Sequence, residues 1–223
     1  VSVQRGLTPL VGRGLEVELL RERWARAKAG AGQVVVLNGE PGIGKSRLVQ
    51  VLKEQVTQEG ATRLELRCSA YHQHSAYHPI LDHLQRLLGF AAHDSAQTKL
   101  DKLTQMLARY RFPQPETLPL LAAFLSLPHP EQLPPLALSP QKQKEKTQAA
   151  IVAWLVEEAT KTPVYCVWED VHWADPSTVE VLTLLLAQVP ATRLLALVTC
   201  RPEFVSPWGT RSYLSHVTLS RLE

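Results

Sequence analysis

Apolar and polar residues follow two alternating periods along the chain. Apolar residues that recur every three to four positions predict helices at 15–29, 46–58, 78–88, 96–110, 141 to about 160, and 177–188. Short apolar runs predict strands at 34–37, 63–68, 164–168, 194–199 and 217–219. Because strands and helices alternate, we expect an α/β fold with a parallel sheet, right-handed crossovers and helices on both faces.

Proline interrupts this pattern between the second and third predicted strands. Eight of the 16 prolines fall between Pro113 and Pro140. We expect this stretch to be too broken for regular strands or long helices, because proline removes a backbone donor. The segment 90–140 is therefore predicted as an insertion that is partly helical and rich in proline.

The composition is that of an ordinary globular protein. The 223 residues include 24 Lys and Arg against 21 Asp and Glu, a formal net charge of +3, so charge does not indicate a nucleic-acid partner. Three cysteines without a C-x-x-C pair favour a reducing compartment. No apolar run reaches the roughly 18 residues of a membrane helix, and the N-terminus lacks the apolar core of a signal peptide. We therefore expect a cytoplasmic protein without membrane contact.

A phosphate-binding loop is predicted between the first strand and the second helix. The sequence GEPGIGKS at 39–46 matches G-x-x-x-x-G-K-[ST] in the required context. Glycines let the backbone N–H groups turn inward, lysine adds a positive charge, and the serine hydroxyl suits Mg²⁺. The alternative is a glycine turn with an incidental lysine. The predicted cofactor-binding residues are Gly39, Glu40, Pro41, Gly42, Ile43, Gly44, Lys45, Ser46 and Arg47.

The third predicted strand leads into the sequence VYCVWED at 164–170, which ends in two carboxylates. In a nucleoside triphosphatase, Glu169 would hold Mg²⁺ through a water, together with Ser46, and Asp170 would polarise the attacking water. Because aspartate is short, slow turnover is expected. The alternative is a solvated strand end.

The residues after this strand have simpler predicted roles. Asp175 is predicted to cap a helix that begins at Pro176. Trp173 is predicted to pack, and His172 to make a structural hydrogen bond.

Further candidates lie at other strand ends. Arg201 follows the fourth strand and is predicted to sense the γ-phosphate, with a salt-bridged strand-end arginine as the alternative. The run YHQHSAYH at 71–78, with His83, lacks zinc-finger spacing. We therefore expect these histidines to cap helices or pack against other side chains.

With these motifs placed, the chain resembles a P-loop ATPase of the STAND class (signal transduction ATPases with numerous domains), in the AAA-like branch and of the AAA_16 type. The supporting elements are LVGR at 10–13, GEPGIGKSRLV at 39–49, WEDVHWADPS at 168–177 and TCRPEF at 199–204. The resemblance implies strand order 5-1-4-3-2 and places Val11, Gly12 and Arg13 in the nucleotide site. Gly14 stands where this family usually has glutamate.

The resemblance also implies a function. Residues 1–223 are expected to form one P-loop ATPase core, with the N-terminal element and helix at 1–32, cut from a longer multidomain protein. ATP or ADP and Mg²⁺ are the implied cofactors, with slow hydrolysis. The expected role is a conformational or oligomerisation switch in a signalling protein, beside winged-helix, helical-repeat or class III cyclase domains. The alternatives are a nucleotide-stabilised scaffold without productive hydrolysis and, with less support, a DNA-associated ATPase.

Overall fold

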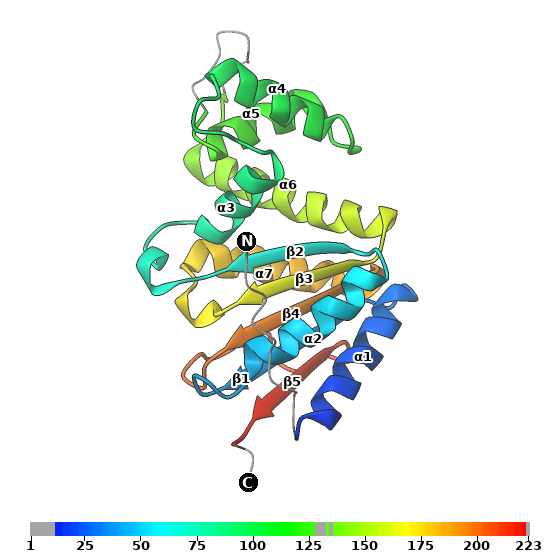
Figure 1. Cartoon of the computed structure of the whole chain (residues 1–223). Helices are drawn as coiled ribbons and strands as arrows, with labels where there is room; N and C mark the ends of the chain where they lie inside the picture. The colour runs from blue at the N-terminus through cyan, green and yellow to red at the C-terminus, as the bar shows by residue number, and fades with distance from the viewer. Residues whose placement is uncertain (1–11, 128–132, 134–135, 222–223) are drawn as a thin grey trace.

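A computed structural model describes residues 12–127, 133 and 136–221. Its centre is a parallel five-stranded sheet of order β2-β3-β4-β1-β5, which confirms the predicted order (Figure 1). The strands are β1 (Gln33–Gly39), β2 (Thr62–Arg67), β3 (Val164–Glu169), β4 (Leu194–Cys200) and β5 (Leu214–Leu219). The prediction placed the start of the last strand three residues too late, because β5 is a partly exposed edge strand with weak apolar patterning.

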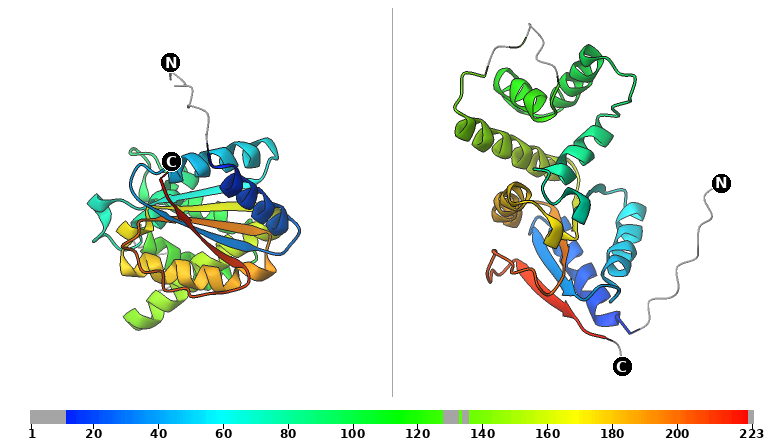
Figure 2. Two further views of the ribbon diagram at one scale, coloured as in Figure 1. Left: turned by 90° about the horizontal axis from the view of Figure 1, so that it is seen from below. Right: turned by 90° about the vertical axis from the view of Figure 1, so that its left-hand side faces the viewer.

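The strands alternate their side chains between two apolar cores. Val34 and Val36 of β1 face one core, and Val35 and Leu37 face the other. The helices α1 (Gly14–Lys28) and α2 (Lys45–Gln58) cover the second core, and α6 (Pro140–Lys161) and α7 (Pro176–Gln188) cover the first (Figures 1 and 2). The expectation of helices on both faces is therefore confirmed.

A helical insertion separates β2 from β3, as predicted. It contains the short turn η1 (Ala70–His72) and the helices α3 (His78–Leu87), α4 (Ala96–Leu107) and α5 (Gln114–Phe124), and α6 returns the chain to the sheet. The right-hand view of Figure 2 shows α4 and α5 as a layer set apart from the sheet.

The proline-rich segment forms one helix of 11 residues, α5, which the sequence did not locate. Pro115 lies in the first helical turn, where its missing N–H has no intrahelical partner to lose. Pro119 does remove one interior hydrogen bond. Burial of Leu120, Leu121 and Ala122 offsets that loss, so tertiary packing decides the structure here.

Gly32 marks a close approach between two backbones. A Cβ added at Gly32 would lie 1.9 Å from the carbonyl oxygen of Val189, in the turn η3 (Val189–Ala191). The turn that leads into β1 therefore packs directly on the turn that leads toward β4, and only glycine fits.

The described helices include none that combines the length and the apolar character needed to cross a lipid bilayer.

Candidate functional site

The loop between β1 and α2 depends on two left-handed glycines. Gly42 has φ 77° and Gly44 has φ 106°, a region that residues with a side chain rarely adopt. Gly44 precedes the first residue of α2, and no side chain within the described part of the chain caps that helix. Among the described residues, no partner is found for the backbone N–H groups of Lys45 and Ser46, so an anion can bind there, and the helix dipole favours negative charge.

Gly39 holds the base of the same loop. A Cβ at Gly39 would lie 2.9 Å from Cγ2 of Ile43 and 3.2 Å from Cβ of Leu219. The loop thus folds back onto its own strand and onto the end of β5.

Lys45 lies along the inside of the loop and is 8% exposed. Its Nζ donates to the carbonyl oxygen of Gly39 and, at 2.9 Å, to that of Glu40. Burial lowers the pKa of Lys45 most, and the nearby Asp170 carboxylate opposes that effect. The ammonium group is therefore held by carbonyl oxygens that a phosphate could replace.

A cavity of about 320 Å³ opens beside this loop. It is lined by Pro41, Gly42, Gly44, Lys45, Ser46, Arg47, Asp170 and Arg201. Three side chains are cationic and one is anionic, so the cavity suits an anion with several charges. The structure thus brings most of the predicted loop residues together with Asp170 and Arg201.

The two predicted carboxylates face different surroundings. Asp170 adopts φ 56°, and its backbone N–H donates to Oγ1 of Thr199 at 2.9 Å, which turns the chain toward the cavity. Glu169 is not among the lining residues. It pairs in register with Arg67 of β2, and burial raises the pKa of Glu169. A water-mediated contact from Glu169 to Mg²⁺ stays a prediction.

Arg201 lies both at the cavity and beside a carboxylate, and its role as a γ-phosphate sensor stays a prediction. It lines the cavity, and its Nη1 lies 3.8 Å from Oε1 of the exposed Glu203. Its guanidinium also lies over the ring of Trp173, at 5.4 Å from Cζ to the ring centroid. Trp173 therefore supports a residue of the cavity, a contact that the sequence does not reveal.

The structural hydrogen bond predicted for His172 is not found. Both of its ring nitrogens are buried, and neither has a partner among the described residues. Burial lowers the pKa of His172, and the neighbouring Arg201 cation adds to that effect.

The prediction for Asp175 and Pro176 is confirmed. Asp175 Oδ1 accepts hydrogen bonds from the backbone N–H groups of Ser177 (2.9 Å) and Thr178 (3.1 Å), and α7 begins at Pro176. The other oxygen, Oδ2, accepts one from the backbone N–H of Tyr77 at 3.1 Å. Tyr77 has φ 60°, a strained conformation for an aromatic residue. This link between the helical insertion and the loop after β3 has no sequence signal.

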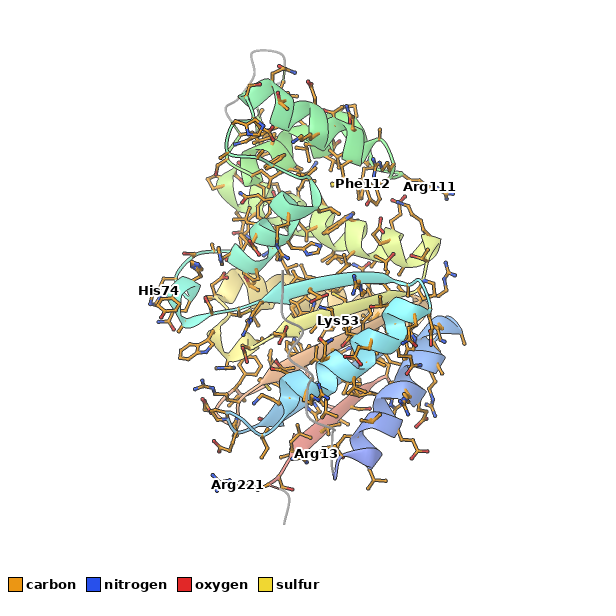
Figure 3. All side chains as sticks on the ribbon, viewed as in Figure 1. Arg13, Lys53, His74, Arg111, Phe112 and Arg221 are labelled. Carbon is orange, nitrogen blue, oxygen red and sulfur yellow. The ribbon has the colours of Figure 1, made fainter. Side chains whose placement is uncertain are left out.

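Arg13 lies beside Ile43 of the phosphate loop, and its contact with a nucleotide stays a prediction. It is 5% exposed and does not line the cavity. Its Nη1 donates to Glu16 at 2.8 Å, and its Nη2 donates to the carbonyl oxygens of Ile43, at 3.4 Å, and Ser220. Figure 3 shows Arg13 close to the end of β5. Gly12 precedes it with φ 73°, and the prediction for Val11 lies outside the described residues.

The histidines of the β2–α3 segment pack on other rings. His72 and His78 stack with 3.6 Å between ring centroids, and His83 lies 6.0 Å from Trp154. Within the described ranges, no group of three or more His, Cys, Asp or Glu residues could hold a metal ion.

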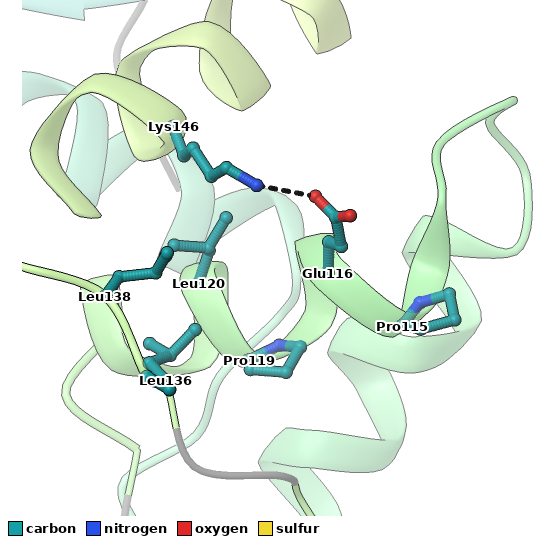
Figure 4. Close-up of a pocket in the computed structure, with 8 residues that line it drawn as sticks. Pro115, Glu116, Pro119, Leu120, Leu136, Leu138 and Lys146 are labelled. Atoms are coloured by element: carbon teal, nitrogen blue, oxygen red, sulfur yellow. Dashed lines mark hydrogen bonds and ion pairs between the residues drawn. The ribbon is translucent and has the colours of Figure 1, made fainter. Parts of the chain in front are cut away.

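A second cavity, of about 230 Å³, lies in the helical insertion (Figure 4). Its lining is mainly apolar, from Pro115, Pro119, Leu120, Leu136, Ala137 and Leu138, with Glu116 and Lys146 paired at 2.8 Å. It lacks the cationic lining of the first cavity and does not suit a polyphosphate.

Comparisons with known proteins found one similar curated protein. A protein of Rhizobium meliloti (strain 1021), described as uncharacterized, is 26% identical over 205 residues, which cover 90% of this chain and 19% of that protein. The chain thus spans about a fifth of the length of this relative.

Two solved structures are similar at low identity. Cdc6p from Pyrobaculum aerophilum has a TM-score of 0.48 and 14% identity, covering 96% of this chain and 47% of that one. A STAND protein with a tetratricopeptide repeat sensor from Pyrococcus horikoshii has a TM-score of 0.43 and 15% identity, covering 96% and 23%.

The family assignment rests on a direct match along the sequence. The family model described as AAA ATPase domain matches residues 9–198, which include the phosphate loop, β3 and most of β4. The chain therefore belongs to the AAA ATPase domain family, with an AAA-like P-loop ATPase fold.

Proposed function

We propose that this domain is an ATP-binding regulatory module of a signalling protein, which hydrolyses Mg·ATP slowly and switches neighbouring domains or copies. One observation carries the proposal. Lys45, Asp170, Arg201 and the N-terminus of α2, which no described side chain caps, surround a single cavity of about 320 Å³. Its size and excess of positive charge suit a nucleotide polyphosphate.

The loop residues would bind the phosphates. Backbone N–H groups at Gly42 and Gly44 and in the first turn of α2 would donate to phosphate oxygens, and Lys45 would exchange its carbonyl partners for them. Arg201, held by Trp173, would contact the terminal phosphate.

The residues at the cavity also fit Mg²⁺. Ser46 lines the cavity and offers a hydroxyl oxygen, a ligand that this hard cation prefers, and Glu169 would hold the ion through a water. When bound, Mg²⁺ would neutralise the charge that develops on the phosphate oxygens. Asp170 would orient the attacking water and accept its proton.

The switch follows from the difference between ATP and ADP. A ligand shifts a conformational equilibrium only through contacts that differ between states, and Arg201 is the residue placed for a contact that ADP lacks. Neighbouring winged-helix, helical-repeat or cyclase domains, and nucleotide-dependent association of copies, are part of this proposal. Nucleic acid is not, because the sequence offers no basic stripe or DNA-reading motif.

Calorimetric titration tests the nucleotide site. ATP should bind the wild-type chain in the presence of Mg²⁺, and Lys45→Ala should abolish binding. Equal affinity in the two proteins would overturn the assignment. GTP and ADP titrations on the same preparation establish base preference and the contribution of the terminal phosphate.

Phosphate release separates an ATPase from a nucleotide-stabilised scaffold. Slow release that Asp170→Asn removes is the expected result. Binding without release above background would favour the scaffold, and retardation of DNA that persists at high salt would favour a DNA-associated ATPase.

A further inference from the structure

The outward side of the phosphate loop is bound by a buried cation. When the N–H groups of such a loop point inward to a ligand, its carbonyl groups point away and need partners of their own. The carbonyl oxygen of Ile43 accepts a hydrogen bond from Nη2 of Arg13, with 3.4 Å between the two atoms. Arg13 is 5% exposed, so this cation acts in a poorly solvated environment.

The position of Ile43 in the loop makes this contact important. The carbonyl of Ile43 and the N–H of Gly44 belong to one peptide group. A positive charge on the carbonyl oxygen polarises that peptide and strengthens its N–H as a donor. Gly44, with φ 106°, is the last residue before α2, where the dipole also favours an anion.

We propose that Arg13 is a positioning residue for phosphate binding, which acts on the ligand through the Ile43–Gly44 peptide; this inference rests on the proposed function. The guanidinium holds the loop from behind and makes the Gly44 N–H a stronger donor. It does so without contact to the nucleotide.

Packing around the guanidinium fixes the same part of the loop. The Ile43 side chain sits against Gly39 and Leu219, and Nη2 of Arg13 also donates to the carbonyl of Ser220, just after β5. The Glu16 carboxylate accepts a hydrogen bond from Nη1 of Arg13 at 2.8 Å and orients the guanidinium group. Arg13 therefore joins the start of α1, the phosphate loop and the end of β5.

Ligand titrations of Arg13→Gln test the inference. We expect affinities for inorganic pyrophosphate, ATP and GTP to fall by a similar factor, about tenfold, because the charge-assisted contact to the Ile43 carbonyl is lost. The ratio of ATP to GTP affinity should stay unchanged. Unchanged pyrophosphate affinity, or a changed ratio of ATP to GTP affinity, would overturn the proposal in favour of a base contact.

Two matched variants separate positioning from general instability. Glu16→Gln removes the ion pair but keeps both carbonyl contacts, so it should retain most pyrophosphate affinity. Arg13→Lys keeps the positive charge on a shorter side chain and should lose an intermediate amount of pyrophosphate affinity. If Arg13→Gln does not fold, Arg13→Lys takes its place in the titrations. Equal losses in Glu16→Gln and Arg13→Gln would contradict the proposal.

A measurement on the nucleotide-free protein keeps this inference distinct from the proposed function. The amide ¹⁵N chemical shift of Gly44 reports polarisation of the Ile43–Gly44 peptide. It should change in Arg13→Gln and remain nearly constant in Glu16→Gln. A constant Gly44 shift in both variants would refute the inference even if ATP binds, whereas absence of ATP binding with a changed shift would refute only the proposed function.

Discussion

The guanidinium of Arg201 lies over the indole ring of Trp173, with 5.4 Å between Cζ and the ring centroid. This stacking holds a cavity residue at the end of β4 by means of a side chain from the loop after β3. Replacing Trp173 with leucine should free Arg201 and weaken the contact with a terminal phosphate that we propose for it. We expect ATP affinity to fall about fivefold, or about 1 kcal/mol, with ADP affinity little changed.

Calorimetry with ATP and ADP checks this prediction. Trp173→Phe is the matched control, because a smaller aromatic ring keeps part of the interaction. An equal loss for both nucleotides would show that Trp173 acts on the whole site rather than through Arg201.

Asp175 should contribute strongly to the free energy of unfolding. It is 5% exposed, caps α7 and accepts the backbone N–H of Tyr77. Asp175→Ala removes the cap and leaves a donor unpaired, so we expect a loss of about 2–4 kcal/mol in chemical denaturation. Ser139→Ala, at the exposed cap of α6, should cost about 1 kcal/mol or less. Similar losses in the two variants would contradict a special role for Asp175.

Gly32 and Gly14 form a matched pair for substitution by alanine. A methyl group at Gly32 would collide with the Val189 carbonyl, and we expect Gly32→Ala to lower the free energy of unfolding by about 3 kcal/mol. Nothing lies within 4 Å of a Cβ at Gly14, which opens α1, so Gly14→Ala should be neutral or stabilise by about 0.5 kcal/mol. Thermal and denaturant unfolding measure both; a tolerated Gly32→Ala would show that the two turns are not in tight contact.

The stability of the fold should fall on acidification. Burial, followed by the Arg86 cation, lowers the pKa of His83, while its hydrogen bond to the Glu65 carbonyl and the Asp82 and Glu65 carboxylates oppose this. The unfolded chain therefore takes up a proton near pH 6.5 that the folded chain resists. The contribution of neutral His83 to the free energy of unfolding is fully present above about pH 6.5 and declines as the pH falls below that value.

Denaturant titrations between pH 7.5 and 5.5 test this dependence. His83→Phe keeps a ring against Trp154 without a titrating group and should reduce the slope, whereas the exposed His74→Gln should not. An unchanged slope in His83→Phe would assign the acid sensitivity to other groups; burial also lowers the pKa of His78 and of His172.

Local patterns were enough to predict the main part of the fold. The apolar runs around Val34 and Val164 identified buried parallel strands, because such strands carry apolar side chains on both faces. The motif at 39–46 located the cavity, and the cap at Asp175 followed from residue type and spacing alone. These signals are local, so one sequence suffices to see them.

Contacts between distant segments could not be predicted in this way. Arg13 meets Ile43 and Ser220, Trp173 meets Arg201, and Asp175 meets Tyr77. Each pair is brought together by the order of the strands or by the insertion. The helix α5 was missed for a related reason, since its stability comes from burial of Leu121 and its neighbours rather than from local propensity.

The strand order also determines when the cavity can form during synthesis. The strand β1 lies between β4 and β5, so Leu37 is in register with Thr199 on one side and Val217 on the other. A growing chain therefore makes the phosphate loop early and its two flanking strands last. Contacts over such separations form slowly, and both hydrogen-bonding edges of β1 stay unpaired until then. Asp170 and Arg201, which follow β3 and β4, line the cavity, so the proposed nucleotide would stabilise only chains in which both strands have joined the sheet.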